Sequence, residues 1–256
     1  MDADAHTAAD VIAAAAAEAD PERAANSARF FQTQPGGYGE GDEFIGLTVP
    51  VQRRIAKRFK GIGLDAVRDL LDSGVHEHRL IGLFLLRGEF DRARDAAERE
   101  SWVGLYLDAV RRGRVNNWDL VDSSADPILG EHLHRLGDHQ LLLDHAADPD
   151  LWRRRVGIIG TFAFIKHGDA QAILAVAPLV VDDRRDLIQK AFGWMLREMG
   201  KRVDATLLVR YLDDHAAEMG RTALSYAIER LSSESRAHYR SPVSYTHLRA
   251  HETRHD

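Results

Sequence analysis

The sequence predicts an all-α protein made of stacked helical repeats. Apolar residues recur at helical spacing along most of the 256 residues, and no segment has the strict alternation or the valine, isoleucine and threonine content of a sheet. Similar segments also recur at a coarse period. We therefore expect an α-α superhelix, a curved solenoid of HEAT-like helix pairs, with an irregular helical bundle as the alternative.

Each expected helix is a segment in which apolar residues recur every three or four positions. These segments are residues 7–19, 21–33, 50–60, 64–73, 76–89, 91–112, 117–125, 127–136, 138–146, 149–166, 169–181, 184–200, 203–212 and 220–231. A glycine-rich loop from Pro35 to Val49 separates the second helix from the third. Pro50 has the fixed φ that suits the first turn of the third helix.

The repeat signal comes from two pairs of segments. The segments that begin at Arg79 and Arg155 lie 76 residues apart, and those that begin at Asp150 and Asp186 lie 36 residues apart. Paired helices at this spacing are typical of a solenoid whose concave face binds an extended partner. We expect residues 1–240 to form one domain.

Composition excludes several classes of protein. Hydrophobic residues make up 45% and charged residues 29% of the chain, so a core can form. The lack of cysteine removes disulfide scaffolds, zinc ribbons, iron–sulfur clusters and thiol nucleophiles, and it fits a reducing cytoplasm. The apolar stretch from Val11 to Ala17 is too short to span a bilayer, so we expect neither a signal peptide nor a membrane span.

The charge is unevenly distributed along the chain. The formal net charge is −6, but residues 1–50 alone hold nine acids against two bases, a net of −7. The remaining 206 residues carry a net of +1, with their bases in clusters. Such clusters suit phosphate contacts, although solvated helix faces also produce them. A nucleic-acid partner is therefore compatible with the acidic total.

In the helix at 117–125, an aromatic ring and a carboxylate share one face. Asn117 is a good N-cap, and Trp118 and Asp122 follow at i and i+4, with Leu120 and Val121 turned away. Stabilisation of the helix dipole is a complete structural explanation for Asp122. The alternative is a binding or catalytic pair.

In the helix at 149–166, one arginine lies on the apolar side. Arg153 and Arg154 point to the polar side, whereas Arg155 shares a face with apolar residues of the same helix. Charged groups avoid such positions unless they are paired or functional, or unless a long stem covers apolar surface. A structural and a functional role for Arg155 both stay open.

In the helix at 184–200, a tryptophan lies off the buried stripe. At 100° per residue, Trp194 falls about 110° from the centre of that stripe. It lies near three cations, which are Lys190, Arg197 and Lys201. A ring beside cations suits stacking against a group that carries phosphates, whereas packing on the neighbouring repeat is the structural alternative.

Four stretches together resemble the DNA alkylation repair glycosylases built of HEAT-like repeats, the AlkD-like family. They are Gly41 to Gly46 with Val49 to Lys57, Asn117 to Asp122, Leu151 to Arg155, and Ile188 to Glu198. Their order and spacing agree with the family over roughly residues 25–235.

The resemblance implies an activity and a set of site residues. The family removes cationic N3- and N7-alkylated purines, such as 3-methyladenine and 7-methylguanine, from duplex DNA without extruding the base into a deep pocket. Its aspartate, two tryptophans and arginine correspond here to Asp122, Trp118, Trp194 and Arg155. An N-terminal aromatic contact is also implied, for which Tyr38 is the candidate. No lysine lies among these positions, which implies a glycosylase without lyase activity.

The expected DNA-binding residues surround these positions. They are Arg154, Lys190, Arg197, Lys201, Arg114 and Tyr38. We expect a cytoplasmic monomer that binds duplex DNA, without cofactor, metal or membrane. A non-catalytic HEAT-type binder of DNA or RNA, and a protein–protein scaffold, are the competing readings.

The 13 histidines do not predict a metal site. His76 and His78, like His132 and His134, are spaced i,i+2 and do not share a helix face, so we expect them to be solvated. His247, His251 and His255 recur every four residues, as helical ligands would. The segment around them resembles translated sequencing-adapter read-through, and we expect residues 241–256 to be a non-native tail.

Overall fold

The computed structural model describes residues 6–241 and divides into two compact units. The first unit runs from Met1 to Leu136 and the second from Gly137 to Asp256, and each is described by itself. The expectation of one domain over residues 1–240 stays a prediction. The expected tail at 241–256, with its three regularly spaced histidines, lies outside the described residues except for Ser241.

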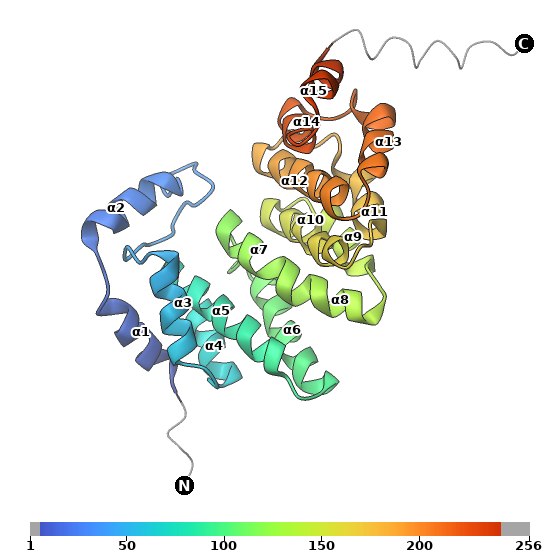
Figure 1. The fold of residues 1–256 in the computed structure, drawn as a ribbon. Coiled ribbons are helices and arrows are strands. Elements are labelled where there is room, and N and C mark those ends of the chain that lie inside the picture. Colours follow the sequence, from blue (N-terminus) through green and yellow to red (C-terminus); the bar gives the residue numbers. More distant parts are fainter. Residues whose placement is uncertain (1–5, 242–256) are drawn as a thin grey trace, which may run out of the picture. The chain divides into compact units, whose positions relative to one another are not determined.

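The first unit consists of helices joined by short turns and one long loop (Figure 1). Its α-helices are α1 (Ala8–Ala16), α2 (Pro21–Phe30), α3 (Val49–Arg58), α4 (Leu64–Leu71), α5 (His76–Arg92), α6 (Ala96–Arg111), α7 (Trp118–Ser124) and α8 (Glu131–Leu136). A π-helix, η1 (Ala125–Gly130), continues α7 without a break.

Helix α5 forms the centre of the first unit. It packs against α3, α4, α6 and α7, and its residues are buried on nearly every side, from Leu80 to Phe90. A helix that is apolar on most of its surface has to be surrounded in this way. The first turn of α5 is buried as well, although its residues are His76, Glu77, His78 and Arg79.

Helix α5 also holds the long loop at residues 31–48. The buried carboxylate of Glu77 accepts hydrogen bonds from the backbone N–H groups of Ile45, Gly46 and Leu47, at 2.8–3.2 Å. An isolated parallel bridge joins Glu43 to Val75 just before the helix. Buried backbone donors need partners, and Glu77 supplies one acceptor group for three of them.

The second unit is built around two helices. Its members are α9 (Gln140–Ala147), α10 (Leu151–Lys166), α11 (Gln171–Val180), α12 (Asp186–Arg202), α13 (Ala205–His215), α14 (Arg221–Ala227) and α15 (Ser233–Arg240). Helix α10 packs against α9, α11 and α12, and α12 packs against α13 and α14 as well. A Cβ at Gly157 would lie only 2.5 Å from the backbone of α9, so a glycine is needed for this close packing.

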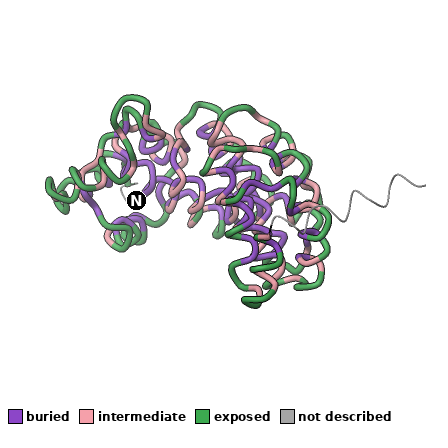
Figure 2. Tube along the Cα trace, turned by 90° about the horizontal axis from the view of Figure 1, so that it is seen from above, coloured by how far each residue is buried: buried purple, intermediate pink, exposed green. Residues whose placement is uncertain are grey.

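Burial follows the helix faces within each unit (Figure 2). Buried positions gather where helices pack on one another, and exposed positions lie on the outer turns. The all-α fold class is confirmed, and the helices within each unit stack in neighbouring pairs. Among residues 6–241, no helix is both long and apolar enough to cross a bilayer.

Three differences from the expected helices have a clear local basis. Helix α6 begins at Ala96 instead of 91, because Asp95 caps it by accepting from the backbone N–H of Glu98. The π-helix η1 replaces the start of the expected helix at 127–136. Helix α15, which the sequence analysis missed, begins after Ser232, whose side chain accepts from the backbone N–H of Ser235.

Candidate active site and cationic groove

The short helix α7 presents Trp118 and Asp122 on its accessible face. Asn117 is its N-cap, and the Asn117 side chain accepts from the backbone N–H of Trp118 at 2.8 Å. Leu120 and Val121 are fully buried, whereas Trp118 and Asp122 are half-buried. The first turn of α7 therefore has the arrangement expected from the sequence, with an aromatic ring and a carboxylate one turn apart.

The π-helix η1 shapes the chain beyond Asp122. Pro127 has no N–H to donate, so it interrupts the regular hydrogen-bond ladder that α7 would otherwise continue. Wide turns of this kind are frequent at functional sites. In this way η1 brings Asp126 and Pro127 to the same groove as Asp122 and Ser123.

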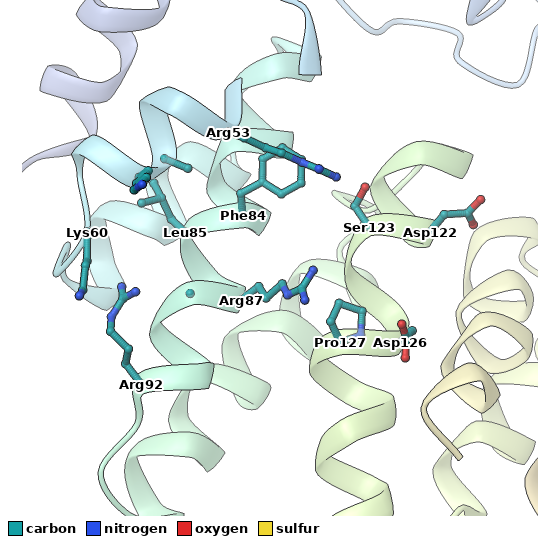
Figure 3. A pocket seen from close by; sticks show the side chains of 13 residues that line it. Arg53, Lys60, Phe84, Leu85, Arg87, Arg92, Asp122, Ser123, Asp126 and Pro127 are labelled. Atoms are coloured by element: carbon teal, nitrogen blue, oxygen red, sulfur yellow. The ribbon is translucent and has the colours of Figure 1, made fainter. Parts of the chain in front are cut away.

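This groove has a volume of about 520 Å³ and belongs entirely to the first unit. Helices α3 and α5 form one wall, and α7 with η1 forms the other (Figure 3). Five cations line it, which are Arg53, Lys57, Lys60, Arg87 and Arg92. Figure 3 shows Arg53 and Arg87 extending toward the wall that carries Ser123, while the carboxylate of Asp122 points away from them at the rim.

The cations of α3 are the most available in the groove. Arg53, Lys57 and Lys60 are exposed, and within residues 6–241 no ion pair joins Lys57 or Lys60 to a carboxylate. Arg53 lies over the ring of Phe84, with its guanidinium carbon 5.2 Å from the ring centroid. Arg53 and Lys57 share one face of α3 at i and i+4, and Lys60 lies in the turn just after the helix ends at Arg58. Together they form a cationic strip along α3 and its C-terminal end.

The two cations of α5 that line the groove take part in ion pairs. Arg87 lies 3.8 Å from the carboxylate of Asp91, and Arg92 pairs with Glu89 on the preceding turn. The Arg87–Asp91 pair is exposed on both sides, and such pairs contribute at most about 1 kcal/mol. Glu89 is mostly buried and also accepts from the backbone N–H of Gly61, so Arg87 is the more available of the two cations.

Trp118 packs against two phenylalanines from the N-terminal segment. Its ring stacks on Phe31 with a centroid distance of 5.3 Å, and Phe30 meets it edge-on at 6.1 Å. Phe30 is 65% exposed, which is unusual for a large apolar side chain. Tyr38, the expected aromatic contact, instead donates its hydroxyl to the carbonyl oxygen of Phe30 at 3.2 Å.

Beneath this aromatic cluster lies a buried polar network centred on His76. Its Nδ1 lies 3.1 Å from Asp42 and its Nε2 lies 2.8 Å from Asp119. Arg79 donates to the other oxygen of Asp42 at 2.7 Å. The expectation that His76 and His78 are solvated is wrong: they are 1% and 7% exposed. Asp42 of the long loop is the partner of His76, and Ser73, just before α5, is the partner of His78.

In the second unit, Trp194 lies half-buried on α12. Its ring is tilted against Phe162 at 5.9 Å, and Lys166 and Arg202 lie over the ring of Phe162 at 5.7 and 5.2 Å. The neighbouring Gly193 fixes how α12 is turned, because a Cβ there would lie 2.2 Å from the carbonyl oxygen of Ala223. The close approach of α14 thus sets the direction of Trp194.

The three adjacent arginines of α10 have different partners. Arg153 lies 3.4 Å from Asp148, and Arg154 donates to Asp183 at 2.8 Å. Arg155 is 5% exposed and donates to the carbonyl oxygen of Leu187 at the start of α12. The departure of Arg155 from the polar side, expected from the sequence, is thus seen in its burial.

The remaining expected DNA-binding cations take part in ion pairs or lie in solvent. Lys190 lies 2.7 Å from Asp186, Arg114 lies 3.7 Å from Asp72, and Arg197 pairs with Glu229. Lys201 is exposed. These residues belong to different units, so the structure describes the surroundings of each and not a common surface.

Sequence reasoning missed two parts of the site in the first unit. One is the cationic strip with Arg87: Arg53 to Lys60 is one of the basic clusters of the sequence, but it was not assigned to the site. The other is the pair Phe30 and Phe31, which no local pattern marks, because they meet Trp118 only through the fold of the loop.

The arrangement limits the chemistry of the first unit. A groove lined by exposed cations fits a chain of phosphates, and the rim holds a carboxylate beside an aromatic face. A carboxylate there can stabilise a developing positive charge, and an aromatic face can hold a cationic ring.

Comparisons with known proteins identify a family and a similar fold. The family model described as DNA alkylation repair enzyme matches residues 11–231. A solved structure described as a predicted DNA alkylation repair enzyme from Enterococcus faecalis is similar, with a TM-score of 0.67 and 15% identity, over 84% of this chain and 98% of the other. No curated protein matches the sequence.

Proposed function

The chain belongs to the family of DNA alkylation repair enzymes, which gives it a role in the repair of alkylated DNA, and we propose that it is a glycosylase for cationic purines in duplex DNA. Its substrates would be N3- and N7-alkylated purines such as 3-methyladenine and 7-methylguanine. The observation that carries the proposal is the carboxylate of Asp122, one turn from the Trp118 ring and at the rim of a groove lined by cations.

The chemistry begins with a weak bond. Alkylation at N3 or N7 gives the purine a positive charge, so the base departs as a neutral molecule when the C1′–N bond breaks and its electron pair passes to the nitrogen. No strong general acid is required. The barrier that remains is the positive charge that develops on the deoxyribose, and water then adds at C1′ with loss of a proton.

Asp122 lowers that barrier electrostatically. A carboxylate about 4 Å from the sugar, in an effective dielectric constant near 20, stabilises the cation by roughly 4 kcal/mol, or about a thousandfold in rate. The carboxylate also accepts a hydrogen bond from the attacking water. In Figure 3 the carboxylate of Asp122 points away from Arg53 and Arg87.

The tryptophans select the damaged base. The π face of Trp118 attracts a cationic ring more strongly than a neutral one, and Trp194 of the second unit provides a second π face for the same class of substrate. Phe31 stacks behind Trp118 and keeps its ring in place. Because recognition uses charge at an accessible ring, the base does not have to enter a deep pocket.

Phosphate contacts position the DNA. In the first unit, Arg53, Lys57 and Lys60 provide a strip of cations along one side of the groove. In the second unit we assign a phosphate to Arg155. A guanidinium carries five N–H donors, so its bond to Leu187 is compatible with a second acceptor.

The proposal further specifies a monofunctional enzyme. Lyase activity needs an amine that forms a Schiff base with C1′. No lysine lies among Trp118, Asp122, Arg155 and Trp194.

Release of free bases from methylated DNA tests this function. Duplex DNA treated with a methylating agent is incubated with the protein, and the released bases are separated by liquid chromatography. We expect 7-methylguanine and 3-methyladenine in the filtrate, no release from untreated DNA, and no covalent complex after borohydride reduction.

Two results would contradict the proposal. Salt-sensitive binding to duplex DNA without any released base would favour the non-catalytic DNA-binding reading. Absence of both binding and release would favour the protein–protein scaffold.

A further inference from the structure

The buried histidine of α5 lies between two carboxylates from different parts of the first unit. His76 is 1% exposed, and its ring nitrogens face Asp42 of the long loop and Asp119 of α7. The two carboxylates are 34 and 43 residues away from it in sequence. His76 therefore links the long loop, α5 and α7, which are far apart in the sequence.

These contacts reach the proposed active site by two routes. Asp119 is the residue after Trp118 and lies in the same first turn of α7. The second route runs through rings, because His76 stacks on Phe44 at 4.6 Å and lies 5.0 Å from Phe31, which stacks on Trp118. Both routes end at helix α7, which carries Trp118 and Asp122.

We propose that His76 is a positioning residue for the reaction, which holds the first turn of α7 by donating hydrogen bonds to Asp42 and Asp119 at once. This inference rests on the proposed function, since it assigns a role in that reaction. His76 lies beneath the site and acts through α7.

Only the doubly protonated form of the His76 ring donates hydrogen bonds to both Asp42 and Asp119. Each carboxylate is an acceptor, so both ring nitrogens must carry a proton, which makes the imidazole a cation. A neutral ring donates to one carboxylate and turns a lone pair toward the other. The charged form is the one that clamps the loop, α5 and α7 together.

The charges around the ring favour that form. Burial opposes a positive charge, but the hydrogen bonds that the ring donates to Asp119 and Asp42 outweigh it and raise the pKa of His76 above its ordinary value. Asp119 faces the ring from α7 and Asp42 from the loop, while Arg79, on its own helix, acts in the opposite direction. The rings of Phe31 and Phe44 carry no charge.

The test uses one substitution at the histidine and one at its partner. His76→Gln keeps one donor nitrogen and cannot titrate, and Asp119→Asn keeps an acceptor but removes the negative charge. His78→Gln is the matched control, because His78 is buried in the same helical turn but lies 2.9 Å from Ser73 instead of a residue of α7.

Two readouts are followed from pH 5.5 to 9. The first is the 19F resonance of Trp118 in protein that contains 5-fluorotryptophan, identified by its loss in Trp118→Phe. The second is the single-turnover rate of 7-methylguanine release from a duplex oligonucleotide, corrected for spontaneous loss. The resonance needs no DNA, so it reports on α7 whether or not the protein is a glycosylase.

We expect the Trp118 resonance and the rate of base release to titrate with the same midpoint. In the wild type and in His78→Gln, the Trp118 resonance shifts with a midpoint above pH 6.5, and the rate falls about tenfold through the same midpoint, as for the loss of one charge-assisted hydrogen bond. In Asp119→Asn the midpoint moves to lower pH. In His76→Gln both titrations are absent and the rate stays at the lower level.

Other outcomes separate the two proposals. A Trp118 titration that persists in His76→Gln, or one that does not move in Asp119→Asn, overturns the role of His76. If His76→Gln does not fold, Asp119→Asn decides the question alone. A shared resonance titration with no base released by any variant overturns the glycosylase and leaves the clamp on α7 in place.

Discussion

Asp119 and Asp122 on helix α7 lie in different environments and therefore have different roles. Asp119 is 2.8 Å from the buried ring of His76 and forms part of the network that supports the helix. Asp122, almost one turn further on, lies half-buried at the rim of the groove. The first helps to fix the structure, and the second is the group that we assign to the chemistry.

Loss of the Trp118 ring should weaken the selection for cationic bases. Trp118→Ala removes a π face, and a desolvated cation–π contact contributes about 2 kcal/mol, so we expect release of 7-methylguanine to fall roughly 30-fold. Trp118→Phe keeps a weaker π face and should lose less. Single-turnover release measures both variants, and equal rates for Trp118→Ala and the wild type would exclude a role in base recognition.

At the scale of elements, α3 and the loop before it have separate tasks. Helix α3 provides the cationic strip, and the loop at 31–48 carries Phe31, Phe44 and Asp42 to the neighbourhood of α7. The loop has little regular structure of its own. Its position therefore depends on contacts with the first turn of α5.

The cationic strip should govern the salt dependence of DNA binding. Each phosphate contact contributes about 0.9 to the slope of log affinity against log salt for duplex DNA. The double variant Arg53→Ala, Lys57→Ala should lower that slope by nearly 2, measured by fluorescence anisotropy. Arg68→Ala is the control, since Arg68 pairs with Asp65 on α4 away from the groove. An unchanged slope in the double variant would place the DNA elsewhere.

Replacement of Glu77, which holds the loop at residues 31–48, should destabilise the protein. Glu77→Gln leaves buried backbone N–H groups of the loop with a weaker acceptor, and we expect the free energy of unfolding to fall by about 3 kcal/mol. Urea denaturation gives this value. Glu18→Gln, which loses only an exposed pair with Arg54, should change it by less than about 1 kcal/mol. A similar small change in Glu77→Gln would mean that the loop is held by other contacts.

The sequence predicts elements better than it predicts their partners. The N-cap Asn117 and the alternation of buried and accessible residues in α7 are local, so the helix and the facing of Trp118 and Asp122 could be predicted. The burial of His76 could not, because its partners come from segments 34 and 43 residues away. The π-helix was also missed, since a proline after Asp126 is equally compatible with a new helix start.

At the scale of the molecule, each unit has a buried arginine on a central helix. The similar segments that begin at Arg79 and Arg155 lie on α5 and α10, and both arginines are buried and donate to backbone carbonyl oxygens. The repeat signal in the sequence thus corresponds to helices that lie at the centre of each unit. The all-α class follows from periodicity over the whole chain, which is why it could be predicted while individual polar partners could not.

The titration of buried groups should give the protein a stability maximum on the acidic side of neutrality. Burial opposes ionisation of Asp42, Asp183 and Glu198, but hydrogen bonds from His76, Arg185 and Arg202 lower their pKa values, so their stabilisation is lost as the pH falls below about 4. His76 acts in the opposite sense. Its pKa is raised, so its contribution is complete below about pH 6.5 and is lost as the pH rises through its folded value.

Urea denaturation between pH 3 and 9 checks this profile. The free energy of unfolding should decrease at the acidic end in every variant, and the decrease above pH 6.5 should be missing in His76→Gln. A decrease above pH 6.5 that is equal in His76→Gln and the wild type would show that another group is responsible.

The central claim is that the carboxylate of Asp122 stabilises the transition state of base loss, and one rate ratio tests it most directly. Single-turnover release of 7-methylguanine from a defined duplex is measured for the wild type, Asp122→Asn and Asp65→Asn, an exposed aspartate of α4 that carries the same change of charge. We predict a roughly thousandfold loss in Asp122→Asn and a change below about twofold in Asp65→Asn. Equal rates for Asp122→Asn and the wild type would contradict the account.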